Sequence, residues 1–138
     1  MKEGGKILVA YDGSDSSNMA VAKALETAKA NKGSVTLLYV YWDPDERRSD
    51  LIMHSVENAE EDQGSRIFTD IEKKLKKSGV EYDLRVEQQS DIPKGILAVA
   101  TKEGFDAIAV GTTGTGGKPV GPVYQKLKAQ SKIPLLTP

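Results

Sequence analysis

The sequence predicts an α/β fold: one domain over residues 1–138, with a doubly wound, five-stranded parallel sheet and helices on both faces. Short apolar runs alternate along the chain with segments whose apolar residues recur at helical spacing. Glycine or proline marks most junctions between them. Strict alternation of strands and helices favours right-handed crossovers, and therefore a mostly parallel sheet. The chain has no cysteine, and at this length it can bury a core without disulfides.

The first strand is expected at residues 7–10, which read Ile-Leu-Val-Ala, and the first helix soon after them. A turn of sequence Tyr-Asp-Gly-Ser-Asp separates the two. Serine and aspartate side chains at 14–17 can cap the helix, because they accept hydrogen bonds from its first N–H groups. Gly33 is expected to end this helix. Its apolar positions are Val21, Leu25 and Ala28.

The next two strands differ in pattern. Residues 34–42 are continuously apolar, which is typical of a strand that is covered on both faces, so this strand is expected inside the sheet. Residues 82–87 alternate apolar and charged side chains, which favours one wet face and a place near the sheet edge. Between the strands we expect a polar surface excursion at 43–64. A helix then runs to Gly79, with apolar positions Ile67, Ile71 and Leu75.

The last part of the chain repeats the alternation. The segment Ser-Asp-Ile-Pro at 90–93 predicts the start of a helix that Asp91 caps, since proline is accepted in a first helical turn. This helix has a buried stripe of Ile96, Val99 and Ala100 and is expected to end at Gly104. A strand at 107–110, a helix at 123–131 and a short strand at 133–137 complete the prediction.

A glycine-rich stretch at 111–121 lies between the fourth strand and the fourth helix. A strand, a glycine loop and a helix in this order allow backbone N–H groups and the positive end of the helix to approach a phosphate. Lys118, inside the loop, can meet a phosphate or remain solvated. Asp12, after the first strand, can accept hydrogen bonds from a sugar hydroxyl or a base amino group, or can simply form a turn before Gly13. A flexible connection is the alternative for the glycine loop.

Composition argues against several partners and cofactors. Nineteen basic and twenty acidic side chains give a net charge of −1, which offers no overall attraction to nucleic acid or to an anionic membrane. With no cysteine and His54 as the single histidine, we expect neither a structural metal nor a serine hydrolase triad. The apolar run at 7–10 is too short for a signal peptide or a membrane span, so a cytoplasmic location is expected.

Three stretches together resemble the universal stress protein family: ILVAYDGSDSS from residue 7, EGFDAIAVGTTG from residue 103 and SKIPLL from residue 131. The resemblance implies a Rossmann-like sheet of the adenine nucleotide α-hydrolase type, with strand order 3-2-1-4-5, and a homodimer formed through the last strands. It also implies that Asp12 and Val40 hold the adenine and ribose of ATP, and that Gly111 and Gly114 approach its phosphates. The full set of candidate nucleotide-contacting residues is Ala10, Asp12, Val40, Gly111, Gly114, Gly116, Gly117, Gly121 and Val123.

One departure from the family pattern bears on the ligand. Nucleotide-binding members place nine residues between the second and third motif glycines and follow the third with serine or threonine. Here six residues separate Gly114 from Gly121, and Pro122 follows. Proline supplies neither an N–H nor a hydroxyl to a terminal phosphate. The sequence therefore predicts a regulatory module with a degenerate, weak site for ATP or AMP, no catalytic residues and at most very slow ATP hydrolysis.

Two alternatives stay open at this point. One is a stress-response interaction protein that no longer binds nucleotide and acts through its dimer and the surface at 43–64. The other is a phosphoryl-accepting receiver domain, which shares the fold class. A receiver needs an acidic pair after the first strand and an acceptor aspartate after the third, whereas the sequence there reads Glu-Gln-Gln-Ser at 87–90.

Overall fold

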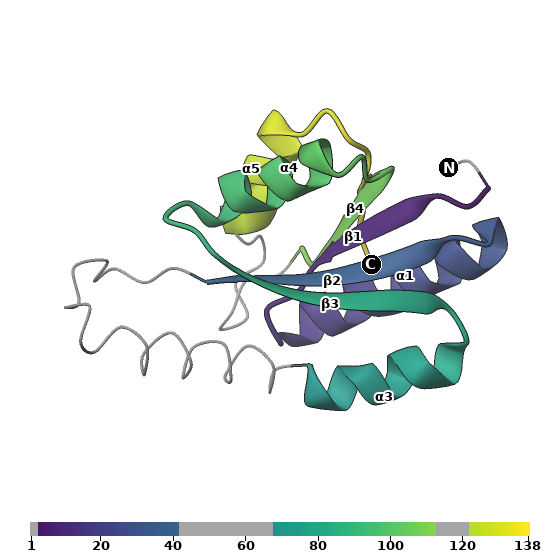
Figure 1. Ribbon diagram of the computed structural model, residues 1–138. Coiled ribbons are helices and arrows are strands. Elements are labelled where there is room, and N and C mark those ends of the chain that lie inside the picture. Colours follow the sequence, from purple (N-terminus) through teal and green to yellow (C-terminus); the bar gives the residue numbers. More distant parts are fainter. Residues whose placement is uncertain (1–2, 42–67, 113–121) are drawn as a thin grey trace, which may run out of the picture.

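A computed structural model describes residues 3–41, 68–112 and 122–138 of the chain, and shows one five-stranded sheet with strand order β3-β2-β1-β4-β5 (Figure 1). Every neighbouring pair of strands is parallel, which confirms the predicted fold class and strand order. The elements are β1 (Lys6–Ala10), α1 (Asp15–Asn31), β2 (Ser34–Tyr41), α3 (Thr69–Ser78), β3 (Glu81–Gln88), α4 (Ile92–Lys102), β4 (Ala107–Val110), α5 (Pro122–Gln130) and β5 (Leu135–Leu136).

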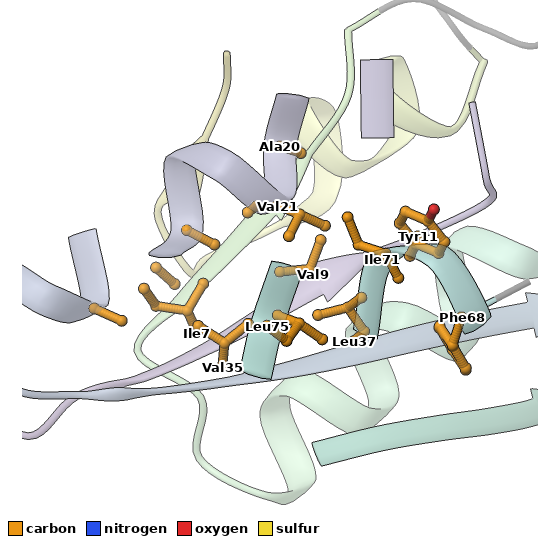
Figure 2. Close-up of a cluster of buried hydrophobic side chains, with 14 residues drawn as sticks. Ile7, Val9, Tyr11, Ala20, Val21, Val35, Leu37, Phe68, Ile71 and Leu75 are labelled. Atoms are coloured by element: carbon orange, nitrogen blue, oxygen red, sulfur yellow. The ribbon is translucent and has the colours of Figure 1, made fainter. Parts of the chain in front are cut away.

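The sheet separates two hydrophobic cores. Successive residues of a strand point to opposite faces, so Val9 lies in the core between the sheet and helices α1 and α3 (Figure 2). Leu8 lies in the core between the sheet and helices α4 and α5. Both side chains are fully buried. Helices thus cover both faces, and the continuously apolar β2 pairs with β1 on one side and β3 on the other. Its predicted interior position is confirmed.

The helix caps follow the sequence signals. At the start of α1, the Ser14 side chain accepts a hydrogen bond from the Ser17 N–H at 3.2 Å. Asp91 does the same for the Lys94 N–H at the start of α4. Gly79 ends α3 in the left-handed conformation with φ +75°. Capping side chains were therefore predicted correctly for α1 and α4.

Gly33 has a different role from the one predicted. The left-handed residue that ends α1 is Lys32, with φ 53°. A Cβ on Gly33 would lie 2.2 Å from the carbonyl oxygen of Gly5, and that same oxygen accepts the Ser34 N–H. Gly33 is therefore required because the chain entering β1 passes directly against it.

The last strand is shorter than the predicted segment at 133–137, since β5 contains only Leu135 and Leu136. The Ser131 hydroxyl donates to the Ile133 carbonyl at 2.7 Å and accepts the Ile133 N–H at 3.1 Å. Both backbone groups of Ile133 are thus used locally, and Pro134 has no N–H to give to a ladder. These two residues delay the strand until Leu135.

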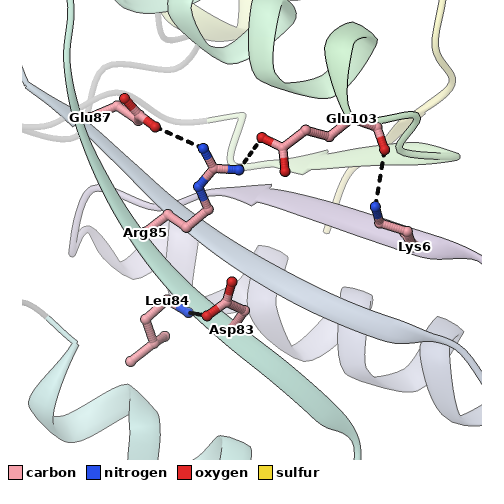
Figure 3. A network of polar contacts seen from close by, with 6 residues as sticks. All are labelled: Lys6, Asp83, Leu84, Arg85, Glu87 and Glu103. Atoms are coloured by element: carbon pink, nitrogen blue, oxygen red, sulfur yellow. Dashed lines mark hydrogen bonds and ion pairs between the residues drawn. The ribbon is translucent and has the colours of Figure 1, made fainter.

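An ion-pair network covers part of the charged face of β3, the edge strand that was expected to be wet. Arg85 donates to Glu103, in the turn after α4, and to Glu87 at 2.8 Å (Figure 3). Lys6 from β1 adds a hydrogen bond from Nζ to the Glu103 carbonyl at 3.0 Å. Arg85 and Glu87 are consequently half-buried. The edge position of β3 is confirmed, but its outer face is partly closed by these contacts.

This network predicts a pH dependence of stability. The hydrogen bond from Arg85 holds the pKa of the Glu103 carboxyl below its usual value of 4.5, with Lys6 and Lys102 adding to the effect. A lowered folded-state pKa stabilises the protein above the unfolded-state pKa, and that stabilisation is lost as pH falls through the folded value. A double-mutant cycle of Arg85→Met and Glu103→Gln, measured by urea denaturation, should show favourable coupling at pH 7 that decreases progressively as the pH falls below 4.5. Coupling that persists at low pH would contradict this assignment.

Candidate functional site

The carboxyl ends of β1 and β4 lie side by side. The two strands are parallel, with Ala10 opposite Val110 at their last paired position. The segments after them, at 11–14 and 111–112, therefore leave the sheet at the same edge, as expected if the two strands are neighbours. From β1 the chain continues through α1 to β2, its neighbour on one side in the sheet. The later strands β4 and β5 lie on the other side of β1, so the strand order reverses between β1 and β4. Ligands of open α/β sheets bind at such a reversal of strand order.

Asp12 forms the turn that leads from β1 into α1. Its Oδ1 accepts the Ser14 N–H at 2.9 Å, and Gly13 follows with φ +83°. The turn role considered from the sequence is thus present. The second carboxylate oxygen makes no hydrogen bond to any residue that the structure describes, and the side chain is exposed. Asp12 can therefore hold the turn with one oxygen and accept from a ligand with the other.

Gly111 packs against the first turn of α1. A Cβ at this position would lie 2.4 Å from Ser16 Oγ and 2.8 Å from the Ser16 carbonyl carbon. No real side chain tolerates these distances, so glycine is needed for helix packing, whatever else it does. The contact brings the positive end of α1 next to the start of the loop after β4.

Tyr11 makes two contacts that sequence reasoning missed. Its hydroxyl donates to Asn18 Oδ1 at 2.7 Å, and its ring stacks on Phe68, with centroids 5.8 Å apart (Figure 2). Burial raises the pKa of Tyr11, and the carboxylates of Asp12 and Asp70 raise it further. The neutral phenol thus fastens the end of β1 to α1 and to the start of α3. An aromatic residue directly before the Asp-Gly turn was the available signal.

Ala10 and Val40 contribute backbone rather than side chain to this edge. Both side chains are buried in the core beneath α4 and α5, with 9% and 7% exposure. Val40 also lies below Gly95, where a Cβ would be 3.4 Å from Val40 Cγ1 and 2.6 Å from Gln89 Cγ. Gly95 was not predicted as important, although a glycine inside a helix was a signal. Val123, on α5, is half-buried against the same core.

The rest of the predicted phosphate loop lies outside the described residues. This applies to Gly114, Gly116, Gly117, Lys118 and Gly121. Within the described ranges, no group of three or more histidine, cysteine, aspartate or glutamate side chains is placed to hold a metal ion. No helix in these ranges is long and apolar enough to cross a membrane.

Comparisons with known proteins agree with this geometry. The model of the universal stress protein family matches residues 4–137. The universal stress protein UspA from Lactobacillus plantarum has a similar structure, with a TM-score of 0.82. The two sequences are 20% identical, and the match covers 99% of this chain and 98% of the UspA chain. Two other similar structures have TM-scores of 0.74 and 0.76. No curated protein sequence matches the chain.

Two further similar structures contain nucleotides. A universal stress protein in complex with cAMP has TM-score 0.70 and 22% identity, over 96% of this chain and 94% of its own. A universal stress protein family protein from Arabidopsis thaliana with AMP bound has TM-score 0.70 and 19% identity, over 96% of this chain and 90% of its own. At these identities the structures establish the shared fold.

Proposed function

Because this chain belongs to the universal stress protein family, we propose that it is a regulatory module that binds an adenine nucleotide, AMP in preference to ATP, at the edge where β1 and β4 end. The observation that carries the proposal is the juxtaposition of Asp12 with Gly111 at this edge, next to the N-terminus of α1. Two structures of the same fold hold cAMP or AMP.

Each part of the nucleotide has a candidate partner. The second oxygen of Asp12 accepts from a ribose hydroxyl or the adenine amino group, and the backbone beside Ala10 and Val40 borders the base. The phosphate meets the N–H groups of the glycine loop and the positive end of a helix. In this proposal the loop contacts come from Gly111, Gly114, Gly116, Gly117, Gly121 and the adjoining Val123.

The preference for AMP follows from the end of the loop. Six residues between Gly114 and Gly121 and the proline at 122 remove two donors that a terminal phosphate would use. A charge-assisted hydrogen bond contributes about 1.5–3 kcal/mol, so each lost donor weakens ATP binding roughly tenfold or more. A single phosphate close to Gly111 does not depend on those donors.

The sequence of the same loop argues against an efficient enzyme. Phosphoryl transfer needs a carboxylate or hydroxyl that holds the metal ion and a group that positions the attacking water. Pro122 stands where the family pattern has the hydroxyl. In this proposal ATP hydrolysis is at most very slow, and the nucleotide acts as a regulatory ligand.

The proposal includes a homodimer formed through β5. This strand lies at the end of the sheet and pairs through Leu135 and Leu136 with β4 on one side. A second copy of the strand, running antiparallel, would extend the sheet from its other side. Sedimentation velocity of the full chain should show a dimer, which Leu135→Pro should dissociate. A monomeric wild-type chain would remove this part of the proposal alone.

Titration calorimetry of the full chain with AMP, ADP and ATP tests the nucleotide proposal. We expect AMP to bind most tightly, and denaturation of freshly purified protein to release AMP. Tighter binding of ATP would contradict the predicted loss at the end of the loop. No heat with any of the three and no released nucleotide would overturn the proposal, and would favour a protein that acts through surface contacts.

Asp12→Asn is the sharpest variant for this site. The asparagine oxygen can still accept the Ser14 N–H, so the turn remains, while an NH₂ group replaces the oxygen assigned to the ligand. Loss of a charge-assisted acceptor should weaken AMP binding about tenfold to a hundredfold. Asp83→Asn on β3, an exposed aspartate that bonds its neighbour's N–H, is the matched control and should leave the affinity unchanged. Equal affinities for both variants would remove Asp12 from the site.

A further inference from the structure

A pocket of about 520 Å³ lies at the opposite end of the sheet from the proposed nucleotide site. It is bordered by the last turns of α4 and α5, by Phe105 just before β4, and by Ile133 shortly before β5. Strands β4 and β5 begin there, whereas the proposed nucleotide site is located where β1 and β4 end. The pocket is therefore a separate feature, and nothing in the proposed nucleotide site involves it.

The floor of the pocket is apolar and firmly held. Ala100 and Phe105 belong to the core beneath α4 and α5, with 0% and 6% exposure, and Leu97 and Ile133 pack against that core. The Ser131 hydroxyl makes hydrogen bonds with both backbone groups of Ile133, and these bonds hold the segment 131–133 in place at the pocket. Volumes of 300–1,000 Å³ with mainly apolar walls are typical of small-molecule sites. The floor suits an aliphatic or aromatic body.

The charged side chain that lines the pocket is positive. Among the described residues, Lys132 is the one charged side chain that lines the pocket. The Lys6 ammonium lies 4.7 Å from the centre of the Phe105 ring, and Lys102 follows Thr101 of the rim. Two carboxylates nearby have cationic or N–H partners: Glu103 is paired with Arg85, and Asp106 Oδ2 accepts the Lys6 N–H at 2.8 Å. Neither carboxylate lines the pocket, so Lys132 is the charge closest to a ligand bound there.

Three carbonyl groups at the two helix ends are occupied by N–H groups of the protein. The Val99 and Ala100 carbonyls of α4 accept the Glu103 and Phe105 N–H groups at 3.0 Å, and the Leu127 carbonyl of α5 accepts the Ser131 N–H at 2.8 Å. Carbonyls that are bonded in this way offer less to a cation than free helix termini do. The rim therefore favours an anion.

We propose that this pocket binds a small amphipathic carboxylate, with its apolar body on Phe105, Leu97 and Ile133 and its carboxylate beside Lys132. An alkyl or aryl acid of this kind satisfies both halves of the site, since burial of the body supplies affinity and the ammonium selects the charge. The proposal stands independently of nucleotide binding at the other end of the sheet.

Octanoate is the probe, and ¹H–¹⁵N spectra of the full chain are the readout. Octanoate should shift the backbone amides of Thr101, Gly104, Phe105 and Ser131, whereas octylamine, with the same tail and the opposite charge, should not. Lys132→Glu should weaken octanoate binding about twofold to fivefold, the effect of one exposed charge contact. Lys74→Glu, on the exposed side of α3 beneath the other face, is the control and should bind as the wild type does.

Thr101→Trp provides a second variant that leaves the core intact, because Thr101 is exposed on the rim. Its indole should cover the pocket mouth and abolish the octanoate shifts. The proposal is overturned if octanoate shifts none of these amides at millimolar concentration, if octylamine binds equally well, or if Lys132→Glu has no effect. Shifts of the same amides that depend on protein concentration without octanoate would show a second copy of the chain in the pocket, and would also overturn it.

Discussion

Gly111→Ala is expected to destabilise the fold by about 1–3 kcal/mol, the usual cost of forcing extra atoms into a packed site. The new Cβ would meet Ser16 at 2.4 Å from its Oγ and 2.8 Å from its carbonyl carbon. The second of these atoms is backbone, so rotation of a side chain cannot relieve the contact. Either the first turn of α1 or the segment after β4 must move, and both border the proposed nucleotide site. AMP binding should therefore weaken together with stability.

A double-mutant cycle with Ser16→Gly separates steric overlap from other causes. Removing the Ser16 side chain takes away the contacts of Oγ and Cβ but leaves the contact with the carbonyl carbon. The cost of Gly111→Ala, measured by urea denaturation, should fall in the Ser16→Gly background without vanishing. Gly104→Ala is the control for binding: φ is +70° there and no atom lies within 4 Å of its Cβ, so it should lose some stability and retain AMP affinity. Unchanged stability of Gly111→Ala would show that the helix is not tightly packed on this residue.

The features that sequence predicted correctly are those set by neighbouring residues. The continuous apolar character of β2 and the alternation in β3 reflect how many faces of each strand are covered, and the interior place of β2 and the edge place of β3 follow from that distinction. Ser14 and Asp91 cap helices through N–H groups three residues away. Such signals span a few residues, so they can be recognised without knowing the tertiary structure.

Features that depend on distant segments were predicted incompletely. Positions 33 and 111 need glycine because another part of the chain lies too close for a Cβ atom. The close segment is at Gly5 for Gly33 and at Ser16 for Gly111. Spacing alone suggested a helix stop for the first and a phosphate contact for the second. The short β5 has a local cause, the bonds from Ser131 to Ile133, which side-chain chemistry permits but does not require.

The same distinction applies to the candidate site, whose location could be predicted before its side-chain contacts could. The position of Asp12 after β1 was predicted from the sequence. Its closeness to the segment after β4 was implied by the resemblance to the universal stress protein family, and the pairing of β1 with β4 confirms it. The hydrogen bond from the Ser14 N–H to one Asp12 oxygen depends on the three-dimensional turn, and so do the contacts of Tyr11 with Asn18 and Phe68. The choice of ligand depends on the glycine loop at 113–121, which lies outside the described residues.

Leu127→Ala is expected to cost about 2–5 kcal/mol, the range for truncating a fully buried leucine. Leu127 is 0% exposed and joins α5 to the core that also contains Leu8 and Ile108. Among the described side chains of this helix it is the one that is fully buried, while Val123 and Tyr124 are half-buried. A helix of nine residues is not stable alone in water, so α5 depends on this contact.

The loss should first appear as local opening of α5 rather than as unfolding of the sheet. Hydrogen exchange of α5 amides should accelerate more than that of β4 amides, because β4 is held by pairing with β1 and β5. AMP affinity should fall in proportion to the population in which α5 is docked, since the helix directly follows the glycine loop. Leu25→Ala is the matched control: Leu25 is half-buried on α1, a helix of 17 residues with six buried positions, and should produce a smaller loss with no separate opening. If α5 and β4 amides of Leu127→Ala exchange at the same rate, α5 is part of one cooperative unit with the sheet, and the loss of binding must then follow global stability alone.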